Sequence, residues 1–196
     1  DISAAVDRQP DVSQGDLAAS MTNAVQVIDA DYRVPFLAHT CMEPLNATAV
    51  VKDGFCEIWI GCQSPLSFRQ AVADSLGFEV ENVTLNNFFM GGGFGRKSRA
   101  DYAIQAAQLA AKVGRPVQLI WSREEDVQQD FYRPAVQSRF RGALDEAGNL
   151  TAWENTYAGK MEPVEAPLIP YTVAAKEIGH VASPTHVPLG AWRSVD

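Results

Sequence analysis

The sequence is poor in residues that bind metals: it contains three cysteines and three histidines in 196 residues. Cys41, Cys56 and Cys62 form no C-x-x-C pair and show none of the Cys/His spacings of zinc or iron–sulfur sites. Cys56 and Cys62 lie in apolar, strand-like stretches, so we expect small buried thiols rather than ligands or nucleophiles. We therefore assign no residue of the chain as a metal ligand.

Positive charge and long apolar runs are also scarce. The chain has 16 Lys and Arg against 24 Asp and Glu, a net charge of -8. Phosphate contacts need a basic face, so the charge predicts no nucleic-acid partner. No apolar stretch is long enough for a transmembrane segment, and 46% hydrophobic residues predict a globular body with a sizeable core.

Charge and periodicity divide the chain near residue 35. Residues 1–35 hold six Asp and two cations with weak periodicity, and we interpret them as an acidic arm or linker plus the first strand. Residues 36–196 are expected to form the main domain. The chain begins at Asp1 and stops at Asp196 without a helix stop signal, so we expect a piece of a longer protein, truncated at its C-terminus.

A glycine-rich loop is the most informative stretch, with four glycines in the five residues 91–95. A predicted strand over 81–89 precedes it, and a predicted helix over 98–114 follows it. Glycine lets a backbone approach a ligand closely, and free N–H groups at a helix start stabilise anions. The alternative is a turn that only reverses the chain, but Phe94 is a bulky aromatic that restricts such a hinge. The loop lacks the spacing of a dinucleotide or P-loop motif.

The other elements alternate between hairpins and helices, which favours an α+β fold with mixed sheets over a doubly wound sheet. Gln63 lies between a predicted strand and a predicted helix, where its neutral amide can donate to a ligand oxygen. The remaining predictions are a hairpin over 47–61 with an Asp-Gly turn, a helix over 66–76 capped by Ser64, a buried strand over 115–121, a short helix after Ser122, a hairpin over 135–157, a loop over 161–170 and a strand over 176–182.

His39 and Glu43 are two titratable groups within five residues. Such a pair invites an acid–base interpretation. A hydrogen-bonded structural pair is the alternative, and we favour it because a single His near a single Glu is more often structural.

Three loops carry a resemblance to a known family: Gly-Cys-Gln-Ser-Pro at 61–65, the glycine loop at 91–97, and Leu-Gly-Ala-Trp-Arg-Ser at 189–194. In this order they resemble the molybdenum hydroxylase family, the large subunits related to xanthine dehydrogenase and aldehyde oxidase. The stretch 37–44 and the ending at 190–195 are most similar to the β subunit of isoquinoline 1-oxidoreductase. The resemblance implies a partial molybdopterin-binding domain over 36–196.

The resemblance implies roles for residues at matching positions only. Gln63 resembles the glutamine whose amide contacts an oxygen ligand of molybdenum, and it is the one catalytic candidate. Gly93, Phe94 and Gly95 resemble the loop that approaches the cofactor with its backbone, and Arg193 resembles an arginine of the next cofactor loop. The family's general-base glutamate is expected beyond Asp196.

The family's reaction hydroxylates an aldehyde or an electron-poor carbon of an aromatic N-heterocycle, with water as the oxygen source. The resemblance implies molybdenum bound to molybdopterin, in the cytosine dinucleotide form common in bacteria. It also implies two kinds of partner: a small subunit with [2Fe–2S] clusters and the rest of the large subunit. Many relatives have glutamate where this chain has Ser98, which argues against purine oxidation. The alternatives are a non-catalytic binding or assembly module without metal, and an unrelated phosphate-binding enzyme.

Overall fold

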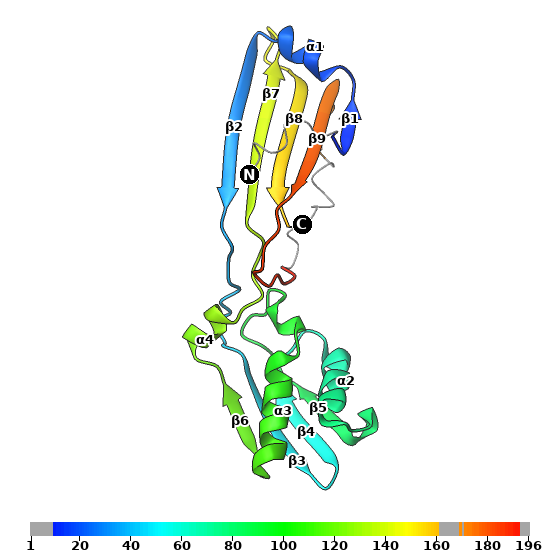
Figure 1. The fold of residues 1–196 in the computed structure, drawn as a ribbon, viewed down its shortest axis with the longest axis vertical. Helices are drawn as coiled ribbons and strands as arrows, with labels where there is room; N and C mark the ends of the chain where they lie inside the picture. The colour runs from blue at the N-terminus through cyan, green and yellow to red at the C-terminus, as the bar shows by residue number, and fades with distance from the viewer. Residues whose placement is uncertain (1–9, 161–168, 170, 193–196) are drawn as a thin grey trace. The chain divides into compact units, whose positions relative to one another are not determined.

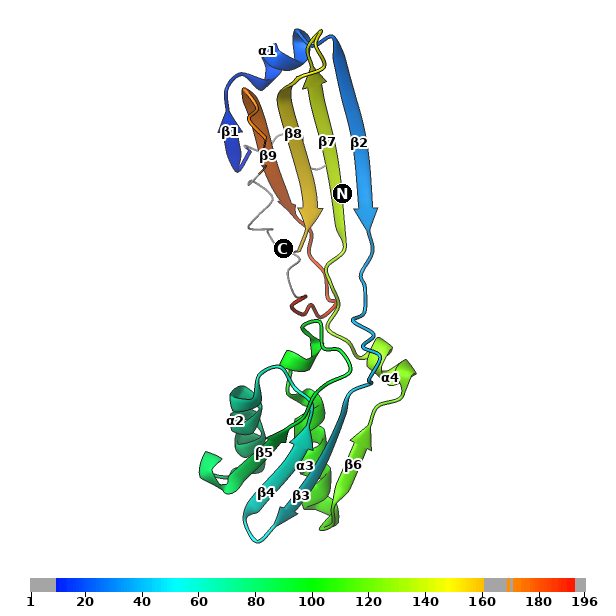
Figure 2. The ribbon, with the colours of Figure 1, turned by 180° about the vertical axis from the view of Figure 1, so that it is seen from behind.

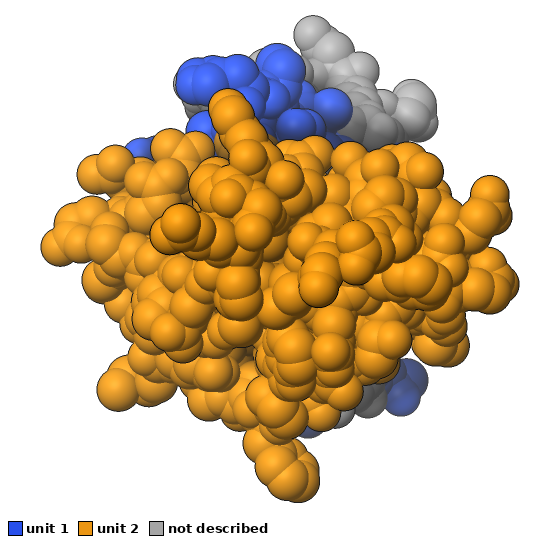
Figure 3. Space-filling view, turned by 90° about the horizontal axis from the view of Figure 1, so that it is seen from below, with its two compact units in different colours: residues 1–37, 134–187, 196 blue, residues 38–133, 188–195 orange. Residues whose placement is uncertain are grey.

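The computed structural model describes residues 10–160, 169 and 171–192. The chain divides into two compact units, coloured separately in Figure 3. Unit 1 comprises residues 1–37, 134–187 and 196, and unit 2 comprises residues 38–133 and 188–195. The larger segment of unit 2, residues 38–133, therefore lies in the sequence between two segments of unit 1.

Unit 1 is built on a five-stranded sheet in the order β1-β9-β8-β7-β2 (Figure 1). β7 and β8 form the predicted hairpin, β2 pairs antiparallel with β7, and β9 runs parallel to β8. A short helix, α1 (Leu17–Thr22), packs on the sheet through Leu17 against alanines of three strands. The strands are β1 (Val12–Gln14), β2 (Gln26–Val34), β7 (Val136–Leu144), β8 (Leu150–Gly159) and β9 (Ala175–Ala182).

The N-terminal segment is part of this sheet. β1 pairs with β9, and β2 pairs with β7 over nine residues, from Gln26 opposite Leu144 to Val34 opposite Val136. The predicted domain boundary after residue 35 therefore lies just past β2. The structure pairs the strands before this boundary, β1 and β2, with strands that lie between residues 136 and 182. The weak periodicity of this segment has a physical reason: β2 is an edge strand and most of its side chains are exposed.

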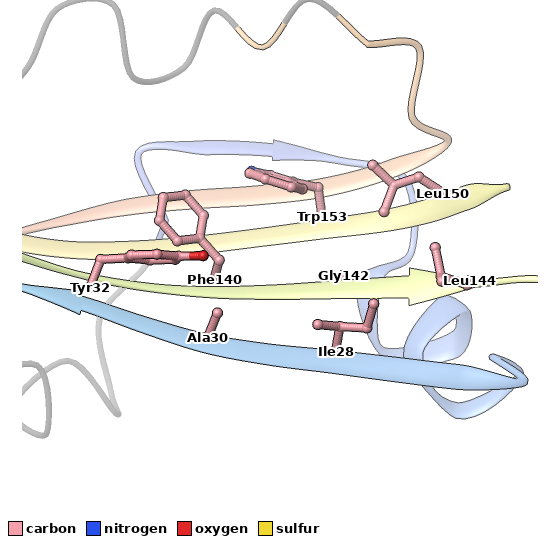
Figure 4. A pocket seen from close by; sticks show the side chains of 8 residues that line it. All are labelled: Ile28, Ala30, Tyr32, Phe140, Gly142, Leu144, Leu150 and Trp153. Atoms are coloured by element: carbon pink, nitrogen blue, oxygen red, sulfur yellow. The ribbon is translucent and has the colours of Figure 1, made fainter. Parts of the chain in front are cut away.

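The two faces of the unit 1 sheet differ in chemistry. One face carries cross-strand ion pairs, Arg139 with Asp31 at 2.8 Å and Arg141 with Asp29 at 2.9 Å. The opposite face holds an open depression of about 400 Å³ whose lining has no charged side chain (Figure 4). Its lining residues are Ile28, Ala30, Tyr32, Phe140, Gly142, Leu144, Leu150 and Trp153.

Unit 2 has a four-stranded sheet in the order β5-β4-β3-β6, with two helices on one of its faces (Figures 1 and 2). β3 and β4 form the predicted hairpin, and β5 returns parallel to β4 after α2. The main core lies between this sheet and helices α2 and α3. The elements are β3 (Asn46–Lys52), β4 (Phe55–Ile60), α2 (Pro65–Leu76), β5 (Val83–Asn87), α3 (Asp101–Val113), β6 (Val117–Ile120) and α4 (Arg123–Gln128). The α+β class with mixed sheets is confirmed.

Local signals placed several element ends correctly. Asp53 and Gly54 both have positive φ, 52° and 82°, as a two-residue hairpin turn requires. α2 ends at Gly77, which is left-handed. Ser64 occupies the N-cap position of α2, as predicted, but its side chain makes no capping hydrogen bond. None of the helices in the described part of the chain is long and apolar enough to span a membrane.

Two predicted elements need correction. The strand predicted as buried is β6, which lies at the edge of the sheet and has an Ile120 that is 61% exposed. The prediction was wrong because a short apolar run fits an edge strand as well as a buried one. The helix predicted from residue 98 begins at Asp101, after a single 3-10 turn at Arg96–Ser98. The predicted loop over 161–170 lies outside the described residues except for Ile169. The loop predicted at 189–194 is confirmed over its described residues, 189–192.

The two serine caps offer a matched comparison. The hydroxyl of Ser122 accepts a hydrogen bond from the Glu125 N–H at 3.1 Å at the start of α4. Ser122→Ala should lower the free energy of unfolding by about 1 kcal/mol, the typical value of a serine N-cap. Ser64→Ala removes no capping bond and should change it by less than about 0.5 kcal/mol. Urea denaturation of the two variants checks this, and equal losses would contradict the assignment of the caps.

Candidate functional site

The glycine loop lies between β5 and α3 in unit 2, and its backbone is unusual. Gly92, Phe94 and Gly95 have φ values of 100°, 50° and 106°. Positive φ is costly for a bulky residue, so Phe94 holds a strained conformation of the kind that is concentrated at functional sites. Phe94 as a residue is 54% exposed and is not part of the core. The loop therefore presents an aromatic ring to its surroundings on a fixed backbone.

Gln63 is fixed against the glycine loop by two hydrogen bonds. Its backbone N–H donates to the Lys97 carbonyl at 2.8 Å, and its side-chain Oε1 accepts from the Gly95 N–H at 3.1 Å. Gly93 makes room for this amide, because a Cβ there would lie 2.5 Å from Oε1. Within the described residues, Nε2 of Gln63 has no acceptor. The geometry leaves Nε2 as a donor.

Several other donors of the loop are unused. The backbone N–H groups of Gly92, Gly93 and Phe94 have no acceptor among the residues that the structure describes. The Gly95 N–H differs, because it is bonded to Gln63 and is not free for a ligand. Successive unpaired N–H groups on a loop form a concavity that suits anions and oxygen ligands.

The third predicted loop meets the glycine loop at Gly95. A Cβ at Gly95 would overlap the carbonyl oxygen of Ala191. That same oxygen lies 3.1 Å from Nε2 of His39, and the His39 ring stacks on Trp192 with centroids 4.8 Å apart. Arg193, the predicted cofactor residue of this loop, lies outside the described residues. The structure therefore brings residues 63, 93–95 and 191–192 together and leaves the role of Arg193 as a prediction.

The two cations that follow the glycines turn inward. The side chains of Arg96 and Lys97 are each 1% exposed. Arg96 forms a two-point pair with Asp101 at 2.9 and 2.6 Å and approaches Asp130 at 3.0 Å. Lys97 Nζ lies 2.6 Å from Glu43. Both charges are paired with carboxylates of the chain, so neither cation is offered to a phosphate ligand.

Asp130 is the centre of this buried network. Its carboxylate accepts from the backbone N–H of His39 at 2.5 Å and from that of Phe131 at 2.7 Å. Nδ1 of His39 lies 3.1 Å from both carboxylate oxygens, and Arg96 faces one of them. Since Nε2 of His39 also faces a carbonyl oxygen, both ring contacts are hydrogen bonds only when the ring carries two protons.

His39 and Glu43 are not partners of each other. His39 pairs with Asp130, and Glu43 pairs with Lys97, the Gly91 N–H and Asn46. The predicted structural role is retained, but the predicted pairing is wrong. Partial burial acts against ionisation of Glu43, yet the bonds from Lys97, Gly91 and Asn46 outweigh it and lower its pKa. The Glu43–Lys97 ion pair therefore stabilises the fold at neutral pH, and this stabilisation is lost only as the pH falls through the lowered pKa of Glu43.

The thiols of Cys56 and Cys62 are buried, as predicted, and so is that of Cys41. Burial raises the pKa of Cys41 and Cys62, and it raises the pKa of Cys56 to about 11. A thiol with a raised pKa carries little thiolate at neutral pH and is a poor nucleophile.

Sequence reasoning missed the residues that support the site. The sequence did not indicate Asp130 or Trp192 as site residues, and it indicated Glu43 only as a partner of His39. Asp130 lies 91 residues from His39 in the chain, and no local pattern reports contacts at such a separation. The one available signal was the pair of cations at 96 and 97, which need buried acids once they turn inward.

Comparison with known protein families gives one match that spans most of the chain. The molybdopterin cofactor-binding domain family matches residues 3–179.

Three curated bacterial oxidoreductases illustrate the sequence similarity. The chain is 39% identical over 134 residues to a membrane-bound aldehyde dehydrogenase [pyrroloquinoline-quinone] of Gluconacetobacter polyoxogenes, covering 67% of this chain and 17% of that protein. It is 35% identical over 145 residues to the aldehyde oxidoreductase molybdenum-binding subunit PaoC of Escherichia coli (strain K12), covering 73% and 20%. It is 33% identical over 119 residues to the isoquinoline 1-oxidoreductase subunit beta of Brevundimonas diminuta, covering 60% and 15%. The chain spans a fifth or less of each of these relatives.

Solved structures share the fold. Quinoline 2-oxidoreductase from Pseudomonas putida 86 aligns with a TM-score of 0.71 at 21% identity, covering 92% of this chain and 25% of that one. Aldehyde oxidoreductase from Desulfovibrio gigas aligns with a TM-score of 0.68 at 24% identity, covering 93% and 22%.

Proposed function

This chain belongs to the molybdopterin cofactor-binding domain family, and from that membership we propose that its unit 2 forms part of the active site of a molybdenum hydroxylase. The enzyme would hydroxylate an aldehyde or an aromatic N-heterocycle and take the oxygen from water. Relatives named as an aldehyde oxidoreductase and an isoquinoline oxidoreductase support both substrate classes. The observation that carries the proposal is the unpaired donor set around Gln63.

The residues present fit a molybdopterin cofactor. The unpaired donors among the described residues are the Gln63 amide and the backbone N–H groups of residues 92–94, and they suit the oxygen and phosphate groups of such a ligand. Gly93 and Gly95 leave space that a Cβ would fill. Trp192 adds a buried indole N–H without an acceptor among the described residues.

In this proposal the bound molybdenum centre supplies the redox chemistry, and the chain supplies position and hydrogen bonds. Gln63 would orient an oxygen ligand through Nε2, since its other amide atom is held by Gly95. A neutral donor aimed where charge develops in the transition state lowers the barrier without bringing a counter-charge. Arg193 would belong to the same cofactor site. Ser98 donates to the Gly95 carbonyl at 2.6 Å and stands where many relatives have a glutamate that helps to hold a purine, so its presence supports a substrate other than a purine.

We further propose the cytosine dinucleotide form of molybdopterin and a partner subunit with [2Fe–2S] clusters that removes the electrons. Both follow from the resemblance to bacterial molybdenum hydroxylases. The rest of the large subunit would provide the general-base glutamate.

Metal and cofactor analysis of the full-length protein tests the proposal. We expect about one molybdenum atom per chain and a pterin that releases cytidine monophosphate on hydrolysis, after expression in a host that makes the cofactor. A bound quinone would favour the cofactor named for the Gluconacetobacter relative. Absence of both would favour a non-catalytic module with the same fold.

Gln63→Ala should reduce turnover of the full-length enzyme while leaving its molybdenum content unchanged. Removing one preorganised donor of this kind costs about 100-fold to 1000-fold in kcat. Steady-state kinetics with an aromatic aldehyde and metal analysis check this. The control is Gln118→Ala on β6, an exposed glutamine of the same unit, which should retain parental kcat. Parental turnover in Gln63→Ala would exclude the proposed role.

A further inference from the structure

Glu43 joins both ends of the glycine loop through one carboxylate oxygen. Oε2 accepts from the Gly91 N–H at 2.7 Å and from Lys97 Nζ at 2.6 Å. The Glu43 N–H donates back to the Gly91 carbonyl at 3.1 Å, and Asn46 donates to Oε1 at 3.2 Å. Since residues 91 and 97 bound the loop, one side chain sets the span between its ends.

The backbone also approaches this glutamate closely. A Cβ at Gly91 would lie 2.7 Å from the Cβ of Glu43, so the first glycine of the loop is a packing requirement as well as a flexible position. The glutamate therefore contacts the loop through its backbone, its Cβ and its carboxylate.

Lys97 depends on the negative charge of Glu43. The lysine side chain is 1% exposed, whereas the glutamate is 33% exposed. A buried ammonium without a counter-charge is strongly unfavourable, so Lys97 stays inside only while the carboxylate is present. Because Glu43 neutralises the charge of Lys97, the lysine connects two parts of the fold and is not available as a cation for a ligand.

The effect of Glu43 extends to Gln63. The Lys97 carbonyl accepts the Gln63 backbone N–H at 2.8 Å, and the Gln63 side chain accepts from Gly95 at 3.1 Å. A displaced Lys97 would therefore release the main chain of Gln63 and the loop that orients its amide.

We propose that Glu43 is a positioning residue of the cofactor site, which rests on the function proposed above. Its charge holds Gly91, Lys97 and, through Lys97, Gln63 in the arrangement that receives molybdopterin. It has no contact with the reacting atoms. Substitution of Glu43 should therefore weaken cofactor retention because the glycine loop is displaced, and not because a direct contact with the cofactor is removed.

The test compares Glu43→Gln, Glu43→Gln with Lys97→Met, and the control Glu57→Gln in the full-length enzyme. Glu57 is an exposed glutamate of β4 that accepts from Asn86 at 3.0 Å, away from the loop. Glu43→Gln should lower the pterin retained after dialysis by about tenfold, the lower end of the range for outer-shell substitutions at metal sites. The control should retain the parental amount.

The double variant separates positioning from general stability. It removes both members of the pair, so no buried charge is left alone, and its unfolding midpoint should return toward the parental value. We expect its pterin retention to stay low, because the link from Glu43 to Lys97 is absent. Parental pterin retention in the double variant would overturn the proposal and reduce the pair to a structural role.

Hydrogen exchange gives a readout that does not depend on the cofactor. In cofactor-free protein, Glu43→Gln should speed exchange at the amides of Gly91 and Gln63 by about tenfold or more, because local opening becomes easier. Unchanged exchange at both amides would also overturn the proposal. A parental enzyme that contains no molybdopterin would instead refute the proposed function, while the exchange rates would still decide the role of Glu43.

Discussion

Gly95→Ala should give a protein that unfolds more easily and holds little cofactor. The new Cβ would overlap the backbone oxygen of Ala191, and backbone atoms cannot rotate away as a side chain can. The residue also has a φ of 106°, which an L side chain rarely adopts. Backbone strain of about 1–3 kcal/mol and overpacking of about 1–3 kcal/mol make a total loss of roughly 2–6 kcal/mol. Chemical denaturation and pterin analysis measure the two effects.

Gly54→Ala is the matched control for this prediction. Gly54 has a φ of 82° in the β3–β4 turn, and a Cβ there would meet nothing within 4 Å. It carries backbone strain without the clash, so it should cost about 1–2 kcal/mol and leave cofactor content unchanged. If Gly95→Ala behaves like Gly54→Ala in both measurements, the contact with Ala191 is not formed in solution.

Asp130→Ala should be similarly damaging for an electrostatic reason. The substitution removes the acceptor of two backbone N–H groups, the hydrogen-bond partner of the His39 ring and one of the two carboxylates that face Arg96. Deleting one partner of a buried network of this kind costs about 3–5 kcal/mol, since the remaining polar groups stay in a poorly solvated place. Arg96 keeps Asp101, so the main loss should be at His39 and at Ala191, which His39 holds.

The measurement for Asp130→Ala is the unfolding free energy together with tryptophan fluorescence. Trp192 stacks on His39, so its emission should report the loosened loop. Glu124→Ala is the control, because Glu124 is an exposed acid of α4 and should change stability by about 1 kcal/mol or less. Parental stability in Asp130→Ala would show that the buried network carries little free energy.

Structural features that depend on a few neighbouring residues could be predicted from the sequence. The Asp53-Gly54 hairpin and the stop of α2 at Gly77 depend on one or two residues, and both predictions are confirmed. The edge position of β6 was not predictable, because it depends on which strand lies beside it. The meeting of Gln63 with Gly95 followed only from the resemblance of whole loops, since 32 residues separate them.

The residues that support the glycine loop show most clearly what the sequence could not predict. In the sequence, Arg96 and Lys97 are only two adjacent cations that follow a glycine-rich loop. In the structure both side chains are buried against Asp101, Asp130 and Glu43. Nothing within a few residues of position 96 distinguishes these outcomes, because two of the three acids are distant in the chain.

The contact between His39 and Ala191 spans 152 residues of sequence, and this has a consequence for biosynthesis. At about 5–20 residues per second, a ribosome needs roughly 3–12 s to proceed from Arg133 to Trp192. During that interval the sheet and helices of unit 2 are already synthesised, while the Gly95 side of the loop is still uncovered. The nascent protein therefore passes through a stage in which Gly95 is uncovered, and this stage ends when residues 191 and 192 emerge and pack against it.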